Sequence, residues 1–134
     1  MFEQALFEYI KANFAITGHT CSFGFGEIDD NTEAPYILQY SLNASGDARF
    51  LCEENDFTSG EAFIQWNIYH PNFSNAFYLK HELMKFIGQL RKITLNYTTY
   101  VVEFNKSENS PSGVSLENGL AVETVVRSFT YNKK

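Results

Sequence analysis

The side chains in this sequence best suited to metal binding or nucleophilic catalysis belong to three histidines and two cysteines. His19 and Cys21 form an H-x-C pair, and Cys52 follows far along the chain. Zinc sites use three or four protein ligands, so this pair is too few without a second close pair. A cysteine–histidine nucleophile would require the same distant residues to converge, which no spacing in the chain indicates. We predict no metal site, and we expect both cysteines to be unpaired thiols.

The other two histidines lie close together in the stretch YHPNFSNAFYLKHEL. His70 directly precedes Pro71, so we expect it to be a turn residue whose ring packs or hydrogen-bonds locally. His81 stands between Lys80 and Glu82, outside the apolar stripe of the helix that this stretch predicts. The ordinary interpretation is a histidine on a helix surface. Neither residue is predicted to be catalytic.

Acidic pairs and glycines also give little support for an enzyme. Asp29–Asp30 and Glu53–Glu54 stand in polar turns, whereas a general acid needs an apolar pocket that raises its pKa. The stretch GFGEID contains G-x-G, but no third glycine opens a helix and no P-loop lysine follows. None of these residue patterns supports catalysis or phosphate binding.

Composition indicates one folded domain over residues 1–134. Apolar residues make up 44% of the chain and aromatic residues 16%, with 13 Phe and 8 Tyr, which favours a strand-rich domain with a core. The formal net charge is −6, which argues against a basic face that grips nucleic acid. Acidic residues interrupt the apolar pattern of MFEQALFEYIKANF, so it is not a secretory signal. No apolar run reaches the roughly 20 residues of a membrane span, and we expect a soluble, intracellular protein.

Hydrophobic periodicity assigns the elements of the first half of the chain. Residues 2–14 repeat apolar side chains at helical spacing and predict an amphipathic helix. Alternation predicts strands at 21–28 and 36–42, and a further strand or hairpin arm at 48–54. The clearest strand is EAFIQWNIY, residues 61–69, which places Trp66 and Ile68 in the core. Two polar segments, DDNTEAP and residues 43–60, are expected to lie on the surface of these elements.

Pro71 ends that strand, because proline donates no hydrogen bond to a sheet. Ser74 or Asn75 is expected to cap a helix that extends to Lys92, where Arg91 and Lys92 suit its last turn. The apolar stripe of this helix is Ala76, Leu79, Leu83, Phe86, Ile87 and Leu90.

Two strands are predicted after the second helix. They cover residues 97–104 and 120–132, with Leu120, Val122 and Val126 sharing one face of the last strand. A polar loop at 105–119 joins them and is longer than a simple hairpin needs. The predicted fold is α+β: a mostly antiparallel sheet of four to six strands with two helices packed against it.

The order of these elements resembles the tail-terminator, or tail-completion, family of long-tailed bacteriophages. The matching stretches are the opening helix FEQALFEYIKANF, the strand APYILQYSL, the strand–helix unit AFIQWNIYHPNFSNAFYLKHELMKFIGQL, and the final hairpin YTTYVVEF…LAVETVVRSFTY. The resemblance spans most of the chain and rests on element order and hydrophobic pattern. The long loop at 105–119 departs from the family's pattern.

The resemblance implies a structural protein that is not an enzyme and needs no cofactor. Members form a hexameric ring that caps the tail tube, contacts the tail tube protein, and joins it to the head connector protein. An acidic ring of this kind would let DNA pass through without specific binding, and the protein would reside in the virion after assembly in the host cytoplasm. The contacts are expected in polar loops, at Asp29, Asp30, Asn31, Glu33, Glu53, Glu54, Asp56, Lys106, Glu108, Asn109, Ser112 and Glu117.

Two other classes of function remain open on the sequence. One is a generic bacterial interaction module that forms no ring, and the other is a ligand-binding domain. A small α+β domain can bind or transform an apolar metabolite in a pocket between its sheet and helices, and the many aromatic residues would line such a pocket. Capping of tail tubes favours the tail-terminator interpretation, whereas binding of a small ligand by a monomer favours the ligand-binding domain.

Overall fold

The computed structural model describes residues 2–15, 20–29, 31–42, 59–95, 97–105, 114–117 and 119–133. The predicted strand at 48–54 lies outside these residues. In chain order the elements are α1 (Phe2–Asn13), β1 (Ser22–Phe25), β2 (Tyr36–Leu42), β3 (Ser59–His70), α3 (Phe73–Gly88), β4 (Lys92–Leu95), β5 (Thr98–Asn105), β6 (Val114–Glu117) and β7 (Leu120–Lys133).

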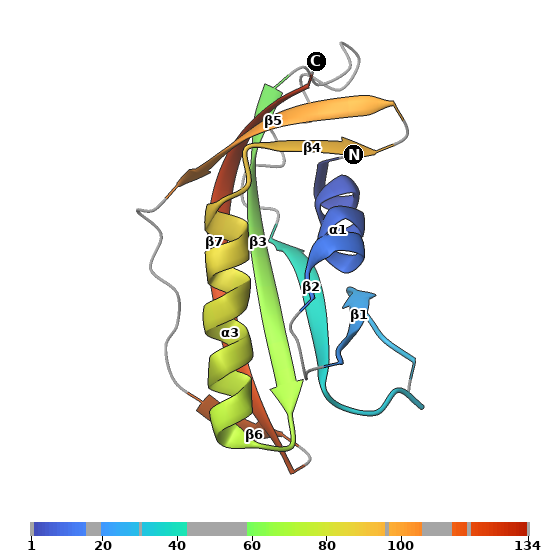
Figure 1. Cartoon of the computed structure of the whole chain (residues 1–134), viewed down its shortest axis with the longest axis vertical. Helices are drawn as coiled ribbons and strands as arrows, with labels where there is room; N and C mark the ends of the chain where they lie inside the picture. Colours follow the sequence, from blue (N-terminus) through green and yellow to red (C-terminus); the bar gives the residue numbers. More distant parts are fainter. Residues whose placement is uncertain are drawn as a thin grey trace.

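The strands form one curled sheet that confirms the α+β class and corrects the predicted pairing. Six strands follow the order β1-β2-β3-β7-β5-β4, and β6 pairs with β7 beside this path (Figure 1). The β1–β2 pair is parallel, whereas the other pairs between described strands are antiparallel. The sheet is therefore mixed, not mostly antiparallel. The cause is the connection 26–35, which carries the chain back before β2 begins, as a parallel pair requires.

The long strands β3 and β7 form the centre of the sheet. They pair from Ser59↔Asn132 to His70↔Ala121. Along β3, Ala62, Ile64, Trp66 and Ile68 are buried, while the residues between them are less covered. This alternation follows from the two-residue period of a strand, which sends successive side chains to opposite faces. The prediction that Trp66 and Ile68 belong to the core is confirmed.

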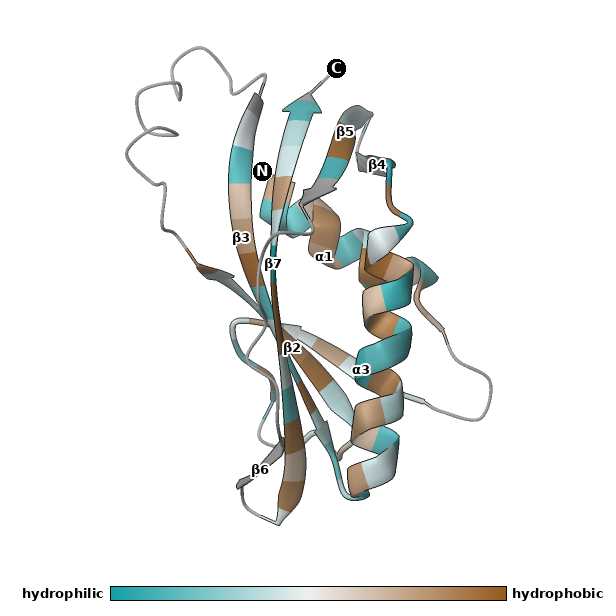
Figure 2. Ribbon diagram, turned by 90° about the vertical axis from the view of Figure 1, so that its left-hand side faces the viewer, coloured by the Kyte–Doolittle hydropathy of each residue, from teal (hydrophilic) through white to brown (hydrophobic). Residues whose placement is uncertain are grey.

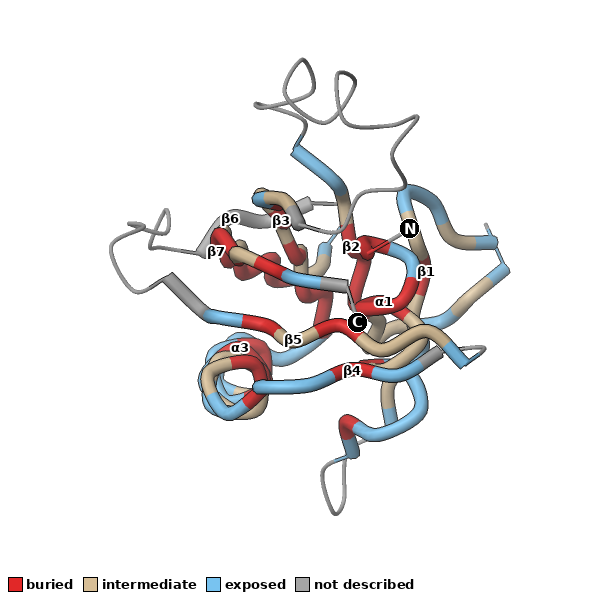
Figure 3. The backbone as a smooth tube through the Cα atoms, turned by 90° about the horizontal axis from the view of Figure 1, so that it is seen from above, coloured by how far each residue is buried: buried red, intermediate tan, exposed pale blue. Residues whose placement is uncertain are grey.

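Both helices cover the same face of this sheet. Helix α3 buries Leu79, Leu83 and Ile87 in one cluster with Trp66 and with side chains of α1, so the predicted core stripe is confirmed for these residues. The hydrophobic side of α3 faces the sheet (Figure 2), and buried residues gather between the layers when the molecule is seen from above (Figure 3). The β4–β5 hairpin crosses the upper end of the molecule, near α1 (Figure 1).

The bounds of α3 differ from the predicted helix at both ends. Asn72 is the N-cap, and its side chain accepts a hydrogen bond from the backbone N–H of Asn75, so Ser74 and Asn75 lie inside the helix. The helix ends at Gly88, and Lys92 begins β4 instead of closing the helix. Ile93 is fully buried in β4, and burying this β-branched side chain in the sheet favours the strand over a further helical turn.

The predicted loop at 105–119 is also corrected, because Val114–Glu117 forms β6. β6 pairs with the start of β7, with Glu117 opposite Leu120. The residues between them are Asn118 and Gly119, and Gly119 has a φ of +79°. An Asn-Gly dipeptide between two strands is a strong hairpin signal, since glycine reaches positive φ without steric strain.

The face of the sheet opposite the helices carries a second, smaller apolar cluster. Leu38, Tyr69 and Val122 form it, and Ile28 of the β1–β2 connection packs against it. Tyr36 stacks on Tyr69 with ring centroids 4.7 Å apart. The connection 26–35 is therefore anchored to this outer face of the sheet.

Candidate interaction surface

The β1–β2 connection is an ordered acidic turn. Gly26 has a φ of +79°, and its N–H donates to the carbonyl oxygen of Gln39 over 2.7 Å. The carboxylate of Asp29 accepts a hydrogen bond from the N–H of Asn31 at 3.0 Å, and its backbone carbonyl accepts one from Thr32 at 2.9 Å. An aspartate that hydrogen-bonds the backbone two residues on fixes a tight turn.

This turn presents three of the predicted contact residues together: Asp29, Asn31 and Glu33 are all exposed, as is Glu27, which the sequence analysis did not select. We call Glu27, Asp29, Asn31 and Glu33 the acidic loop. Glu117 lies apart, at the end of β6. The other predicted contact residues lie outside the described part of the chain: Asp30, Glu53, Glu54, Asp56, Lys106, Glu108, Asn109 and Ser112.

The outward side of α3 carries exposed aromatic side chains that the sequence analysis missed. Phe73 and Phe77 are each 59% exposed, and Tyr78 is 43% exposed. Phe73 and Phe77 are four residues apart and lie one above the other on a helix. We call Phe73, Phe77 and Tyr78 the aromatic surface. Large apolar side chains that gather on a surface mark protein–protein or ligand contacts more often than scattered ones.

A further exposed aromatic residue stands at the turn between β4 and β5. Tyr97 is fully exposed and has a φ of +67°. This left-handed conformation is unusual for a residue with a Cβ atom and costs on the order of 1 kcal/mol. Leu95 and Thr98 pair across this turn between two antiparallel strands, and tight hairpin turns use residues with positive φ.

Two histidines, His70 and His81, lie near the corner between β3 and α3. The Nδ1 atom of His70 accepts a hydrogen bond from the N–H of Asn72 over 2.9 Å, which confirms the predicted local hydrogen bond. His70 itself is the last residue of β3 and pairs with Ala121, so it is not a turn residue. His81 is exposed on α3, as predicted. Among the described residues, no three His, Cys, Asp or Glu side chains are arranged to hold a metal ion.

A buried ion pair joins α3 to the sheet. The Nζ atom of Lys80 lies 3.1 Å from Oε1 of Glu123 on β7, and the two side chains are 11% and 2% exposed. Because both charges are removed from water, each depends on the other for its stability in the interior. The pair lies on the helix-covered face and fixes the position at which α3 crosses β7.

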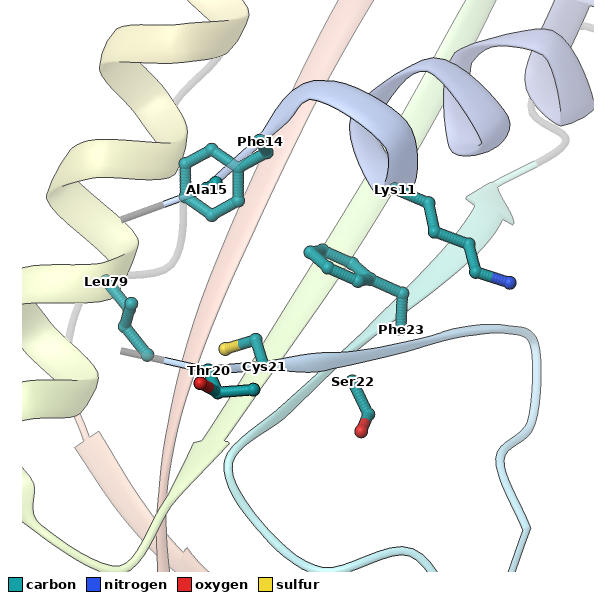
Figure 4. A pocket seen from close by; sticks show the side chains of 8 residues that line it. All are labelled: Lys11, Phe14, Ala15, Thr20, Cys21, Ser22, Phe23 and Leu79. Carbon is teal, nitrogen blue, oxygen red and sulfur yellow. The ribbon is translucent and has the colours of Figure 1, made fainter. Parts of the chain in front are cut away.

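An open cavity of about 630 Å³ lies where α1, β1 and α3 meet. Its walls include the rings of Phe14 and Phe23 and the side chain of Leu79, and Figure 4 shows the thiol of Cys21 directed between these apolar groups. Lys11 stands at the side of the cavity away from α3 (Figure 4). The volume falls in the range of small-molecule sites. The predicted H-x-C pair contributes only Cys21, because His19 lies outside the described residues.

Burial raises the pKa of the Cys21 thiol from its ordinary value of 9.0 to about 11. In a Cys52→Ser variant, we expect alkylation of Cys21 by iodoacetamide to follow an apparent pKa near 11, since the thiolate is the nucleophile. The folded chain holds this proton more tightly than the unfolded chain, so the stability contribution is present below pH 9 and is lost as the pH rises towards 11. Alkylation with an apparent pKa near the ordinary value of 9.0 would contradict this assignment.

No protein-family model matches the chain, and a search of curated proteins finds no match. Within the described residues, neither helix is long and apolar enough to cross a bilayer.

Proposed function

We propose that this chain is a structural assembly protein that caps a bacteriophage tail tube as a ring and joins it to the head connector. The observation that carries the assembly role is the aromatic surface, in which Phe73 and Phe77 are both more than half exposed on a regular helix. The assignment to tail tubes rests on the resemblance of element order and hydrophobic pattern to the tail-terminator family. A closed ring needs two different surfaces that meet in a heterologous contact, and the chain offers the aromatic surface and the acidic loop.

The charge distribution supports passage of DNA through such a ring. On β2, β3 and β7, the described side chains of the outer face are polar, apolar or acidic, with no Lys or Arg among them. Gln65, Asn67 and Thr124 form a hydrogen-bonded group there, with Asn67 accepting from both neighbours. A surface without cations releases no counterions from DNA and therefore holds it weakly.

The test adds the purified chain to growing and to preformed tail tubes of the phage that encodes it. The expected result in electron micrographs is a ring of density at one end of each tube and a narrower distribution of tube lengths. The matched control is a Phe73→Ser/Phe77→Ser variant at the same concentration, which should cap fewer tubes. Tubes that grow without limit and carry no terminal ring in the presence of the wild-type chain would overturn the proposal.

The cavity beside Cys21 favours the second candidate function, a site for a small apolar metabolite. Phe14, Phe23 and Leu79 give it apolar walls, and Lys11, Thr20 and Ser22 add polar groups. Ligand sites combine apolar walls with a few polar groups that orient the ligand. If the chain ignores tail tubes, remains monomeric, and binds an apolar ligand that protects Cys21 from alkylation, this candidate replaces the first.

A further inference from the structure

The aromatic surface and the acidic loop lie on opposite flanks of the molecule. In Figure 1, α3 lies at the left of the molecule and the connection between β1 and β2 at the lower right, and Figure 3 shows the same separation from above. The sheet order agrees, because β1 and β2 stand at one end of the sheet whereas α3 contacts β7 and β3. When two different, complementary interaction surfaces lie on opposite flanks of a molecule, its copies can associate through head-to-tail contacts.

The two surfaces also differ in charge. Between residues 20 and 42 the chain has four carboxylates, at Glu27, Asp29, Asp30 and Glu33, and no Lys, Arg or His. The exposed face of α3 and the segment after it carry three cations against one carboxylate. Lys85 is exposed on α3 and pairs with Glu82 at 3.4 Å, and Arg91 and Lys92 are exposed just beyond the end of the helix. Lys85 is about 12 Å along the helix from Phe77. The helix that carries the aromatic surface and the segment after it thus hold exposed cations, and the acidic loop is their electrostatic complement.

We propose that the aromatic surface of one copy docks on the acidic loop of a second copy. Phe73 and Phe77 lie against the β1–β2 connection, beside its half-buried Ile28, while Lys85 and Lys92 approach Glu27 and Glu33. This inference rests on the proposed ring, since it identifies which two surfaces the ring joins. A symmetric contact between two α3 helices is the competing arrangement, and it would stop at a dimer instead of closing a ring.

Two variants test the two surfaces separately. Phe73→Ser/Phe77→Ser removes the aromatic groups, which are largely exposed. Glu27→Lys/Glu33→Lys reverses two exposed charges and leaves Asp29 in place, because its carboxylate holds the turn through Asn31. Glu61→Lys/Glu103→Lys is the matched control, because it makes the same change of net charge at exposed positions away from both surfaces. Circular dichroism and thermal melting verify that each variant is folded.

The measurement is the mass of the purified chain by sedimentation up to about 1 mM, where even a contact with a Kd of 1 mM is about 40% formed. We expect the wild type and the Glu61→Lys/Glu103→Lys control to self-associate, and each surface variant to do so about tenfold less. An equal mixture of the two surface variants retains one intact contact, so it should give heterodimers and nothing larger. Adding Lys85→Glu/Lys92→Glu to the Glu27→Lys/Glu33→Lys chain should restore self-association.

Three results would overturn the docking proposal: a wild-type chain that stays monomeric, an acidic-loop variant that associates normally, or a mixture that forms no heterodimer. The outcome is separable from that of the tube assay. If the mixture forms heterodimers but the wild type does not cap tubes, the contact stands and the tail function fails. If the wild type caps tubes while the acidic-loop variant also caps them, the function stands and this contact fails.

Discussion

Replacing Lys80 with methionine is expected to lower the free energy of unfolding by about 3–5 kcal/mol, because it leaves the carboxylate of Glu123 buried without its cation. Glu123 is 2% exposed, and the described structure gives it one ion-pair partner, Lys80, at 3.1 Å. Methionine is apolar and similar in length, so lost packing contributes little. Urea unfolding followed by tryptophan fluorescence measures the change, and the chain has a single tryptophan, Trp66.

Two further variants show whether the loss comes from the unpaired charge. Lys80→Met/Glu123→Leu removes both charges and should recover most of the stability, since an apolar pair in place of a buried ion pair is often neutral or stabilising. Lys85→Met is the matched control on the same helix: its partner Glu82 lies 3.4 Å away in a more exposed pair, so the change should stay below about 1 kcal/mol. A double variant as unstable as Lys80→Met would show that packing, not charge, stabilises this position.

The hydrophobic periodicity of each segment was sufficient to predict the centre of the fold, because its core residues recur at regular strand and helix spacings. Trp66 and Ile68 follow the two-residue period of a strand, and Leu79, Leu83 and Ile87 follow helical spacing. The buried side of each element could therefore be predicted from its sequence. The parallel pairing of β1 with β2 left no such signal. Pairing direction depends on where a connection returns the chain, which is a non-local property.

The end of α3 was misjudged for a related reason. Leu90 fits the helical stripe and is also buried in the structure, beyond the end of the helix at Gly88. Periodicity alone therefore could not separate a longer helix from a helix followed by a strand. Gly88 and the β-branched Ile93 carried the missing information, since glycine weakens a helix and β-branched residues favour a strand.

The candidate surface was only half predictable. The acidic loop was found because polar residues in turns are exposed and carry function more often than the scaffold does. The aromatic surface was missed, although Phe73 and Phe77 stand outside the buried stripe and so had to face away from the sheet. The sequence held that signal. The sequence pattern did not show that the two surfaces lie on opposite flanks, because that separation depends on the strand order.

Replacing Trp66 with alanine is expected to destabilise the fold more than any other change considered, by about 4–8 kcal/mol. Its indole is 1% exposed and packs edge-on against Phe129, and deleting such a ring costs about 3–5 kcal/mol through lost burial and the cavity left behind. The indole N–H also donates to Oε1 of Gln39 over 3.0 Å. An acceptor left buried without a donor adds about 1–3 kcal/mol. The two losses together are comparable with the whole stability of a small domain.

The hydrogen bond can be separated from the packing by a double-mutant cycle with circular dichroism as the measurement. The amide of Gln39 also donates to the backbone carbonyl of Glu3 over 3.0 Å, so this side chain links β3 to β2 and α1. Trp66→Phe keeps an aromatic ring and removes the donor, and Gln39→Leu removes the acceptor. We expect the loss from Gln39→Leu to be smaller by roughly 1 kcal/mol when Trp66 is already phenylalanine. Additive losses would show that the two side chains act independently and that the indole stabilises the fold by packing alone.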